Sequence, residues 1–246
     1  MKETRFIMGM PVIVEIKDDS ASENIIGRVF TYFTYIDQIF STYKPDSEIS
    51  RINNGKLLFE DASEDVKDVF DLAEQTKKET NGYFDIKKKD GTYDPSGIVK
   101  GWAINNAANI LLKEGFKDFY VEAGGDIQVY GKGDEGWTIG IKNPFNVKEI
   151  IKVVILKNNE GIATSGSYER GNHIYNPKNK NDALNDIISL TVIGPNIYEA
   201  DRFATAAFAM QREGILFIEK LKGFEGYMVD HNKIATMTSG FDRYLK

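Results

Sequence analysis

The chain has 246 residues, enough to bury a sizeable core, and its 41 % hydrophobic and 28 % charged residues are ordinary values for a globular protein. A formal net charge of −6 without any basic run argues against nucleic acid as a partner. The absence of cysteine excludes disulfides, thiolate metal sites and a cysteine nucleophile. The apolar runs are too short to cross a bilayer, so we do not expect an integral membrane protein.

The first 16 residues indicate the cellular compartment in which we expect the protein. Lys2 and Arg5 precede the apolar run Phe6–Val14, but no small-residue cleavage site and no lipid-modified cysteine follow. We interpret the stretch as a strand and expect a cytoplasmic protein. A chain already trimmed of a targeting segment would look the same and would be extracytoplasmic.

The first half of the chain is predicted to hold one strand and three helices, separated by loops at 42–48 and 83–93. The strand is Phe6–Ile16, and the helices cover roughly Ser22–Phe40, Ala62–Thr80 and Asp94–Gly115. The second half carries short β-rich runs split by Gly, Asn and Pro, then two helices and a hairpin around Asp230–Asn232. The runs are Phe119–Glu122, Ile127–Tyr130, Trp137–Ile141, Ile150–Leu156, Gly161–Thr164 and Ile187–Ile193, and the helices are roughly Glu199–Gln211 and Glu213–Leu221.

This order of elements indicates the fold class. Strand runs alternate with pairs of helices, but not in a strict βαβ rhythm, and no linker or repeat divides the chain. We therefore predict an α+β fold with a largely antiparallel sheet and flanking helices, in one domain over residues 1–246. Gly131–Gly136 fits the pattern G-x-G-x-x-G, but Trp137–Ile141 after it is a strand rather than the helix that dinucleotide binding requires, so we interpret it as a glycine-rich hairpin.

The segment from Asp94 to Trp102 says the most about what the chain could bind. Asp94 suits an N-cap and Pro95 the first helical position, so free N–H groups at the helix start could hold an anion. Gly97 and Gly101 leave room for a ligand to approach the backbone, and Lys100 can add a point charge for phosphate. The alternative is a well-capped amphipathic helix with an exposed lysine.

A second cluster follows the Gly194–Asn196 turn. Asp201 and Thr205 are four residues apart on a predicted helix, so both oxygens lie on one face. A carboxylate beside a hydroxyl suits Mg²⁺, which shares its shell with phosphate oxygens and water. The alternative is a capping aspartate and a packed threonine.

A third cluster lies at a predicted strand end. Ser165 and Gly166 open a small-residue turn whose hydroxyl and N–H groups could line a phosphate. His173 stands among polar loop residues and could act as a base, although an exposed loop histidine is an equal alternative. The three clusters together predict a bound nucleotide or pyrophosphate, without indicating which one.

These segments resemble the ApbE-type FAD:protein FMN transferases, in family order and over nearly the whole chain. The matching motifs are Met8–Pro11, Ser41–Glu48, Asn81–Asp85, Asp94–Lys100, Glu122–Ile127, Ala163–Tyr168, His173–Pro177 and Glu199–Thr205. The resemblance implies Mg²⁺-dependent cleavage of FAD, release of AMP, and transfer of FMN through a phosphoester to a Thr or Ser of an acceptor flavoprotein.

The resemblance also implies roles for individual residues. The predicted contacts to FAD are Met8, Tyr43, Tyr83, Phe84, Asp85, Asp94, Lys100 and Tyr175, and Ser165 and Gly166 join them from the residue pattern. Asp201 and Thr205 would hold Mg²⁺ with backbone oxygen from Gly97 and Ala204. His173 is the candidate base, Asp126 the reserve base, and Lys100 the catalytic cation.

The chain departs from the family pattern in several places. Only eight residues separate Asp85 from Asp94, where relatives have a longer insert, and Asn176 stands where the family has an aspartate. Lys178–Lys180 replace the usual Thr-Gly, and Ala204 occupies a position that is often acidic. Two alternatives therefore accompany the transferase: an FAD pyrophosphatase in which water is the acceptor, and an FAD-binding protein without turnover.

Overall fold

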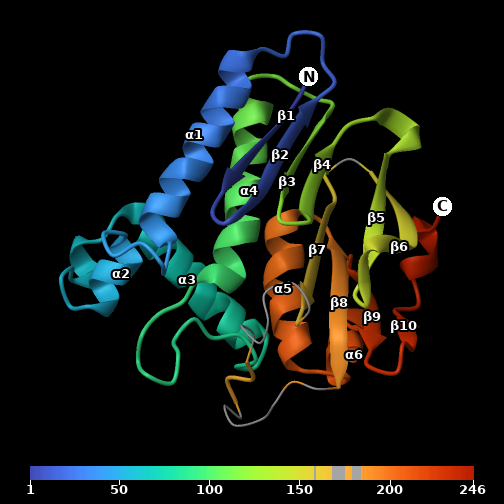
Figure 1. Ribbon diagram of the computed structural model, residues 1–246. Helices are drawn as coiled ribbons and strands as arrows, with labels where there is room; N and C mark the ends of the chain where they lie inside the picture. The colour runs from blue at the N-terminus through green and yellow to red at the C-terminus, as the bar shows by residue number, and fades with distance from the viewer. Residues whose placement is uncertain (158, 168–174, 179–183, 185) are drawn as a thin grey trace.

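The computed structural model describes all residues except 158, 168–174, 179–183 and 185. The described strands form an eight-stranded sheet in the order β1-β2-β3-β4-β7-β8-β9-β10 and a separate two-stranded sheet, β5-β6. All of the strand pairs are antiparallel, and the helices flank the large sheet (Figure 1). The predicted α+β class with a largely antiparallel sheet is confirmed.

The N-terminal strand prediction was wrong in one respect. The run Phe6–Ile16 is the end of β1 (Lys2–Ile7) and the whole of β2 (Met10–Ile16), folded into a hairpin. Met8 and Gly9 form the turn, with φ angles of 57° and 72° in the left-handed region. A tight two-residue turn of this kind needs positive φ at its central residues, which Asn, Asp and Gly usually supply. Methionine is not a typical turn residue, so the sequence did not indicate a turn at Met8.

Strands β3 to β8 agree with the predicted runs to within a few residues, and β9 and β10 form the hairpin predicted around Asp230–Asn232. They are β3 (Phe119–Ala123), β4 (Asp126–Tyr130), β5 (Trp137–Asn143), β6 (Asn146–Leu156), β7 (Gly161–Gly166), β8 (Ile187–Gly194), β9 (Glu225–Asp230) and β10 (Ala235–Met237). The segment with the G-x-G-x-x-G pattern connects β4 to β5 through a short 3₁₀ turn, Gly133–Glu135. It opens no α-helix, as predicted.

Six α-helices lie in the described part of the chain. They are α1 (Glu23–Phe40), α2 (Glu48–Asn53), α3 (Glu64–Glu79), α4 (Ser96–Lys113), α5 (Ile197–Ala209) and α6 (Glu213–Glu219). Helix α2 was not predicted; it is short, and its start is capped by Ser47, whose hydroxyl accepts from the Ser50 N–H at 3.0 Å. Among the described residues, no helix combines the length and apolar character needed to cross a membrane.

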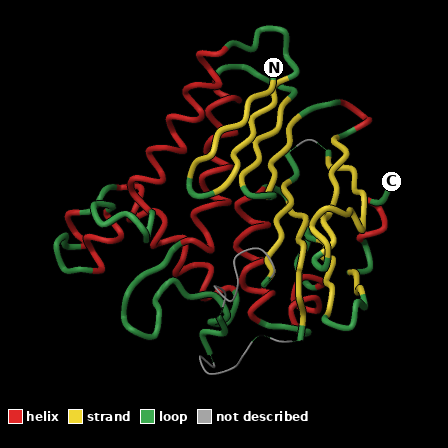
Figure 2. The backbone as a smooth tube through the Cα atoms, viewed as in Figure 1, coloured by secondary structure: helices red, strands yellow, loops and turns green. Residues whose placement is uncertain are grey.

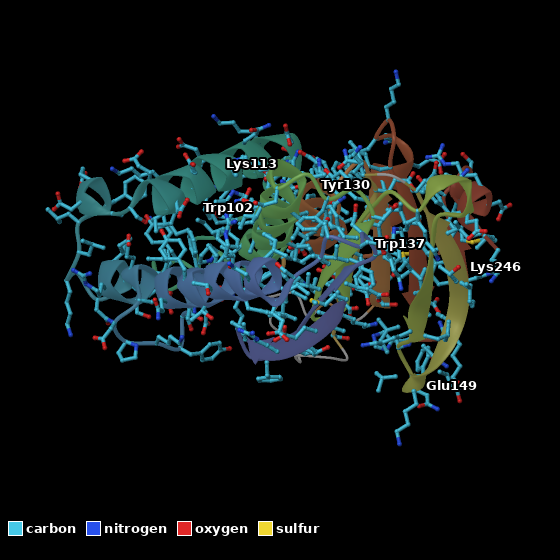
Figure 3. The ribbon with its side chains drawn as sticks, turned by 90° about the horizontal axis from the view of Figure 1, so that it is seen from above. Trp102, Lys113, Tyr130, Trp137, Glu149 and Lys246 are labelled. Carbon is cyan, nitrogen blue, oxygen red and sulfur yellow. The ribbon has the colours of Figure 1, made fainter. Side chains whose placement is uncertain are left out.

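Alternation along the strands gives the large sheet two buried faces. Val121, Leu190 and Met228 point into a core shared with the helices. Tyr120 and Tyr227, their neighbours on the opposite face, belong to a second core covered by the β5–β6 hairpin and the C-terminal segment. Figure 2 shows the helices gathered on one side and the hairpin on the other, and Figure 3 shows Trp137 against the sheet and Glu149 at the outer end of the hairpin.

Candidate functional site

The start of α4 differs from the prediction by one residue. The helix begins at Ser96, and Pro95 rather than Asp94 is the N-cap residue. The Asp94 carboxylate instead accepts the Ser96 N–H at 3.1 Å, while the Asp94 N–H donates to the Ile86 carbonyl at 2.8 Å. The Asp94 carboxylate therefore bonds one of the N–H groups at the helix start that we predicted to be free for an external anion.

Two glycines bring α4 close to α5. A Cβ on Gly101 would lie 2.6 Å from the Asp201 Cβ and 2.9 Å from the Ile197 carbonyl oxygen, and one on Gly97 would lie 3.1 Å from the Thr205 methyl carbon. The contact allows the Gly101 N–H to donate to Asp201 Oδ2 at 2.7 Å. The Thr205 hydroxyl donates to the Gly97 carbonyl at 3.3 Å. Polar groups about a hundred positions apart in the chain thus meet between the two helices.

Lys100 lies between two buried carboxylates. Its Nζ is 2.5 Å from Asp126 Oδ2 and 3.8 Å from Asp201 Oδ1, and these two aspartates are 1 % and 3 % exposed. Asp126 Oδ1 accepts the Thr164 N–H at 3.0 Å, so each of its oxygens is engaged. Burial raises the pKa of Asp201 to about 7, with the Lys100 charge opposing this shift and the Asp126 carboxylate adding to it. When Asp201 is ionised, two carboxylates face one ammonium, and a bound cation would offset the excess negative charge and favour the ionised form of Asp201.

The oxygen atoms beside this cluster fit a hard cation. Asp201 supplies a carboxylate, Thr205 a hydroxyl and Gly97 a carbonyl, and the Ser165 hydroxyl lies 3.5 Å from that of Thr205. No group of three or more His, Cys, Asp or Glu suited to a metal occurs among the described residues. One carboxylate with neutral oxygens matches Mg²⁺, which takes few protein ligands and completes its shell with phosphate and water. Ala204, the fourth predicted ligand through its carbonyl oxygen, lies buried inside α5 next to Thr205.

Several predicted flavin contacts gather beside the start of α4. The Tyr175 hydroxyl donates to the Asp85 carbonyl at 3.0 Å and the Lys87 carbonyl at 3.3 Å, and burial raises the pKa of Tyr175 to about 12. The Lys178 ammonium lies 4.7 Å from the centre of the Tyr83 ring. These contacts hold the segment at 175–178 against the loop before α4.

The other predicted contacts are more dispersed. Phe84 is buried and packs near Gly97 and Thr205, whereas Tyr43 is 96 % exposed in the loop before α2. Met8 forms the β1–β2 turn. His173 lies outside the described residues.

Arg202 is a buried charged residue whose structural role the sequence analysis missed. It is 4 % exposed, pairs with Glu79 of α3, donates to Thr76 at 3.2 Å and to Glu199 at 2.9 Å, and so ties α5 to α3. The prediction that Gly101 leaves room for a ligand was wrong, because α5 fills that space and a Cβ there would lie 2.6 Å from the Asp201 Cβ. Gly97 and Gly101 have the same four-residue spacing as Asp201 and Thr205. That matched spacing was the available signal for two facing helices.

Comparison with known proteins identifies the family of this chain. The model of the ApbE family matches residues 8–90 and 86–228. The chain is 24 % identical over 274 residues to the FAD:protein FMN transferase of Escherichia coli (strain K12), covering 86 % of this chain and 78 % of that protein. The FAD:protein FMN transferase of Vibrio cholerae is 32 % identical over 130 residues, covering 49 % of this chain and 39 % of that protein.

Solved structures show the same fold. The flavin transferase ApbE from Vibrio cholerae superposes with a TM-score of 0.84 at 20 % identity, and the ApbE protein from Thermotoga maritima with 0.88 at 21 %. Each alignment covers 100 % of this chain and 99 % of the other. With the family model matching most of its length, this chain belongs to the ApbE family.

Proposed function

We propose that this protein is a Mg²⁺-dependent FAD:protein FMN transferase that attaches FMN to a Ser or Thr hydroxyl of an acceptor protein and releases AMP. The observation that carries the proposal is the contact of the Thr205 hydroxyl with the Gly97 carbonyl, one turn of α5 from the Asp201 carboxylate, which lies 3.8 Å from the Lys100 ammonium. The names of the relatives from Escherichia coli and Vibrio cholerae support the same reaction.

The reaction requires charge neutralisation more than a protein nucleophile. The acceptor oxygen attacks the phosphorus on the FMN side, the bond from that phosphorus to the bridging oxygen breaks, and AMP leaves with the bridging oxygen. Mg²⁺, held by Asp201, Thr205 and the Gly97 carbonyl, would supply Lewis-acid stabilisation of the phosphate charge. Lys100 adds a fixed positive charge at the same place.

The hydroxyl proton of the acceptor must pass to a base. Asp126 is poorly placed for that role, because the Lys100 ammonium and the Thr164 N–H engage its two oxygens. We therefore keep His173 as the proposed base and assign Asp126 to the positioning of Lys100.

The test is Mg²⁺-dependent FAD turnover by wild type and Asp201→Asn, followed as AMP release. The change removes the only negative charge among the proposed Mg²⁺ ligands, so turnover should be abolished at Mg²⁺ concentrations that saturate the wild type. Asp68→Asn makes the same change on the exposed face of α3 and serves as the matched control. Full activity of Asp201→Asn would show that the metal assignment is wrong.

A further inference from the structure

Arg202 follows the proposed Mg²⁺ ligand Asp201 in α5, and the two side chains contact different helices. The Asp201 carboxylate accepts the Gly101 N–H of α4 at 2.7 Å. The Arg202 guanidinium is buried against the last turn of α3, where it donates to the Thr76 hydroxyl at 3.2 Å and pairs with the Glu79 carboxylate. Consecutive residues of a helix point in different directions, so α5 holds the proposed metal site on one side and the end of α3 on another.

The Arg202 side chain is also fixed on its own helix. Its Nε donates to the Glu199 carboxylate at 2.9 Å, and its Cζ lies 4.0 Å from the centre of the Phe203 ring. Both of these residues belong to α5. A planar guanidinium with five N–H donors can bond α5 and α3 at the same time, whereas a lysine ammonium of equal charge lacks this fixed geometry.

The end of α3 holds the segment 83–85, which carries three of the predicted flavin contacts. The hydroxyl of Thr80, the C-cap residue of α3, accepts the Phe84 N–H at 3.1 Å. The Lys77 ammonium of α3 lies 2.8 Å from Asp85 Oδ2. The position of α3 therefore determines the position of this segment.

The same segment returns to the proposed metal site. The Phe84 ring and the Thr205 methyl group lie 3.3 Å and 3.1 Å from the place that a Cβ on Gly97 would take. Gly97 and Thr205 are two of the proposed Mg²⁺ ligands. The contacts of Arg202 with α3 thus connect the helix that carries Asp201 and Thr205 to the segment that packs beside them.

Of the two helices that Arg202 joins, α5 is the more firmly held. Helix α5 packs against α4, β7 and β8 (Figure 1), and ten of its 13 residues are buried, against four of the 16 residues of α3. Loss of the Arg202 contacts should therefore displace the end of α3 and the segment 83–85, and leave the Mg²⁺ ligands of α5 in place.

We propose that Arg202 is a positioning residue for FAD: it holds the end of α3 on α5 and so places the segment 83–85 where an FAD molecule bound to it reaches the Mg²⁺ ligands. The inference rests on the proposed function and assigns Arg202 a part in FAD binding that acts through α3. A residue that only stabilised the fold would lower the free energy of unfolding, but it would leave the FAD affinity of the folded protein unchanged.

The test compares variants of this contact with two controls. Arg202→Gln removes the charge, and Arg202→Lys keeps it without the planar fork. Glu79→Ala removes the acceptor on α3 from an exposed position, which tolerates substitution if the Arg202 variants do not fold. Asp71→Ala also replaces an exposed carboxylate of α3, and Val154→Ala, which deletes methyl groups in the second core on the opposite face of the sheet, controls for lost stability alone.

Two measurements separate binding from turnover. Flavin fluorescence gives the dissociation constant for FAD in the presence of a chelator, and AMP release gives kcat and the KM for FAD at saturating Mg²⁺. Each variant is assayed under conditions in which urea denaturation shows it to be folded.

Arg202→Gln should raise the dissociation constant and the KM for FAD about fivefold, roughly the effect of one lost hydrogen bond, and change kcat by less than about twofold. Arg202→Lys should fall between Arg202→Gln and wild type. Glu79→Ala should act in the same direction as Arg202→Gln, and the double variant should bind FAD no more weakly than Arg202→Gln alone, because both changes break the same contact. Asp71→Ala and Val154→Ala should bind FAD as the wild type does.

Two results would overturn the proposal. An unchanged dissociation constant and KM for FAD in Arg202→Gln and Glu79→Ala would show that Arg202 only stabilises the fold. A lower kcat with an unchanged KM would show that the contact acts on the Asp201 side of α5 rather than on the segment 83–85. Wild-type protein that neither binds nor cleaves FAD would instead refute the proposed function.

Discussion

Replacing Gly101 with alanine tests the helix contact on which the site depends. The added Cβ would lie 2.6 Å from the Asp201 Cβ and 2.9 Å from the Ile197 carbonyl oxygen. Neither atom can swing away as the end of a flexible side chain could, so α4 and α5 must move apart. Overpacking of a buried contact costs ~1–3 kcal/mol, and the better helix propensity of alanine offsets up to about 1 kcal/mol. We expect a net loss of about 1–2 kcal/mol in the free energy of unfolding.

Gly27→Ala is the matched control for this change. Gly27 also lies within a helix, α1, but its Cβ would meet no atom within 4 Å. The same substitution should therefore stabilise the protein by roughly 0.5–1 kcal/mol through helix propensity alone. Urea denaturation of both variants measures their free energies of unfolding. We expect this free energy to fall in Gly101→Ala and to rise in Gly27→Ala, each relative to wild type.

The contact also predicts a functional effect of Gly101→Ala. Moving α5 displaces the Asp201 carboxylate that the Gly101 N–H holds at 2.7 Å, so Mg²⁺-dependent turnover should fall while Gly27→Ala remains unaffected. If Gly101→Ala were as stable as Gly27→Ala and as active as wild type, the close approach of α4 and α5 would be refuted.

Three further predictions concern other parts of the chain. Arg202→Leu leaves two half-exposed glutamates without their cation and should lower the free energy of unfolding by about 2 kcal/mol, measured in urea. His173→Ala should slow FMN transfer in a stopped assay with little change in FAD affinity measured by fluorescence; a large loss of affinity would make it a ligand contact instead. The Ile234 N–H and other donors lower the pKa of Asp230 from its ordinary value of 3.8. The stability that Asp230 contributes is therefore fully present above that value and is lost as pH falls through the folded pKa. The difference in melting temperature between wild type and Asp230→Ala should accordingly be large at neutral pH and shrink in acid; a difference independent of pH would contradict this reasoning.

Most elements of the fold were predictable because their periodicity is local. The apolar stripe of α1 and the alternation in β3 and β8 each lie within one element and need no knowledge of distant residues. The β1–β2 turn and α2 were not predictable by the same reasoning. The turn places a methionine at positive φ, and α2 is too short for a periodic signal to show.

The candidate site was also predictable only where its residues lie within one element. Asp201 and Thr205 could be paired from their spacing, since one helix carries both. The pairing of Lys100 with Asp126 and the contact of Gly101 with Asp201 join separate elements, and only tertiary packing determines them. Arg202 was missed because a single arginine next to an aspartate has no sequence pattern that distinguishes a buried, paired arginine from one on the surface.

The proposed function is the transfer of FMN from FAD to an acceptor protein. The most direct measurement incubates the purified protein with FAD, Mg²⁺ and an acceptor domain bearing one flavinylation-type threonine, then weighs the domain by mass spectrometry. The expected result is a mass gain corresponding to one FMN phosphoester, release of AMP in equal amount, and loss of both with a chelator. Free FMN and AMP without a mass gain would indicate hydrolysis, and intact FAD bound to the protein in every sample would contradict turnover altogether.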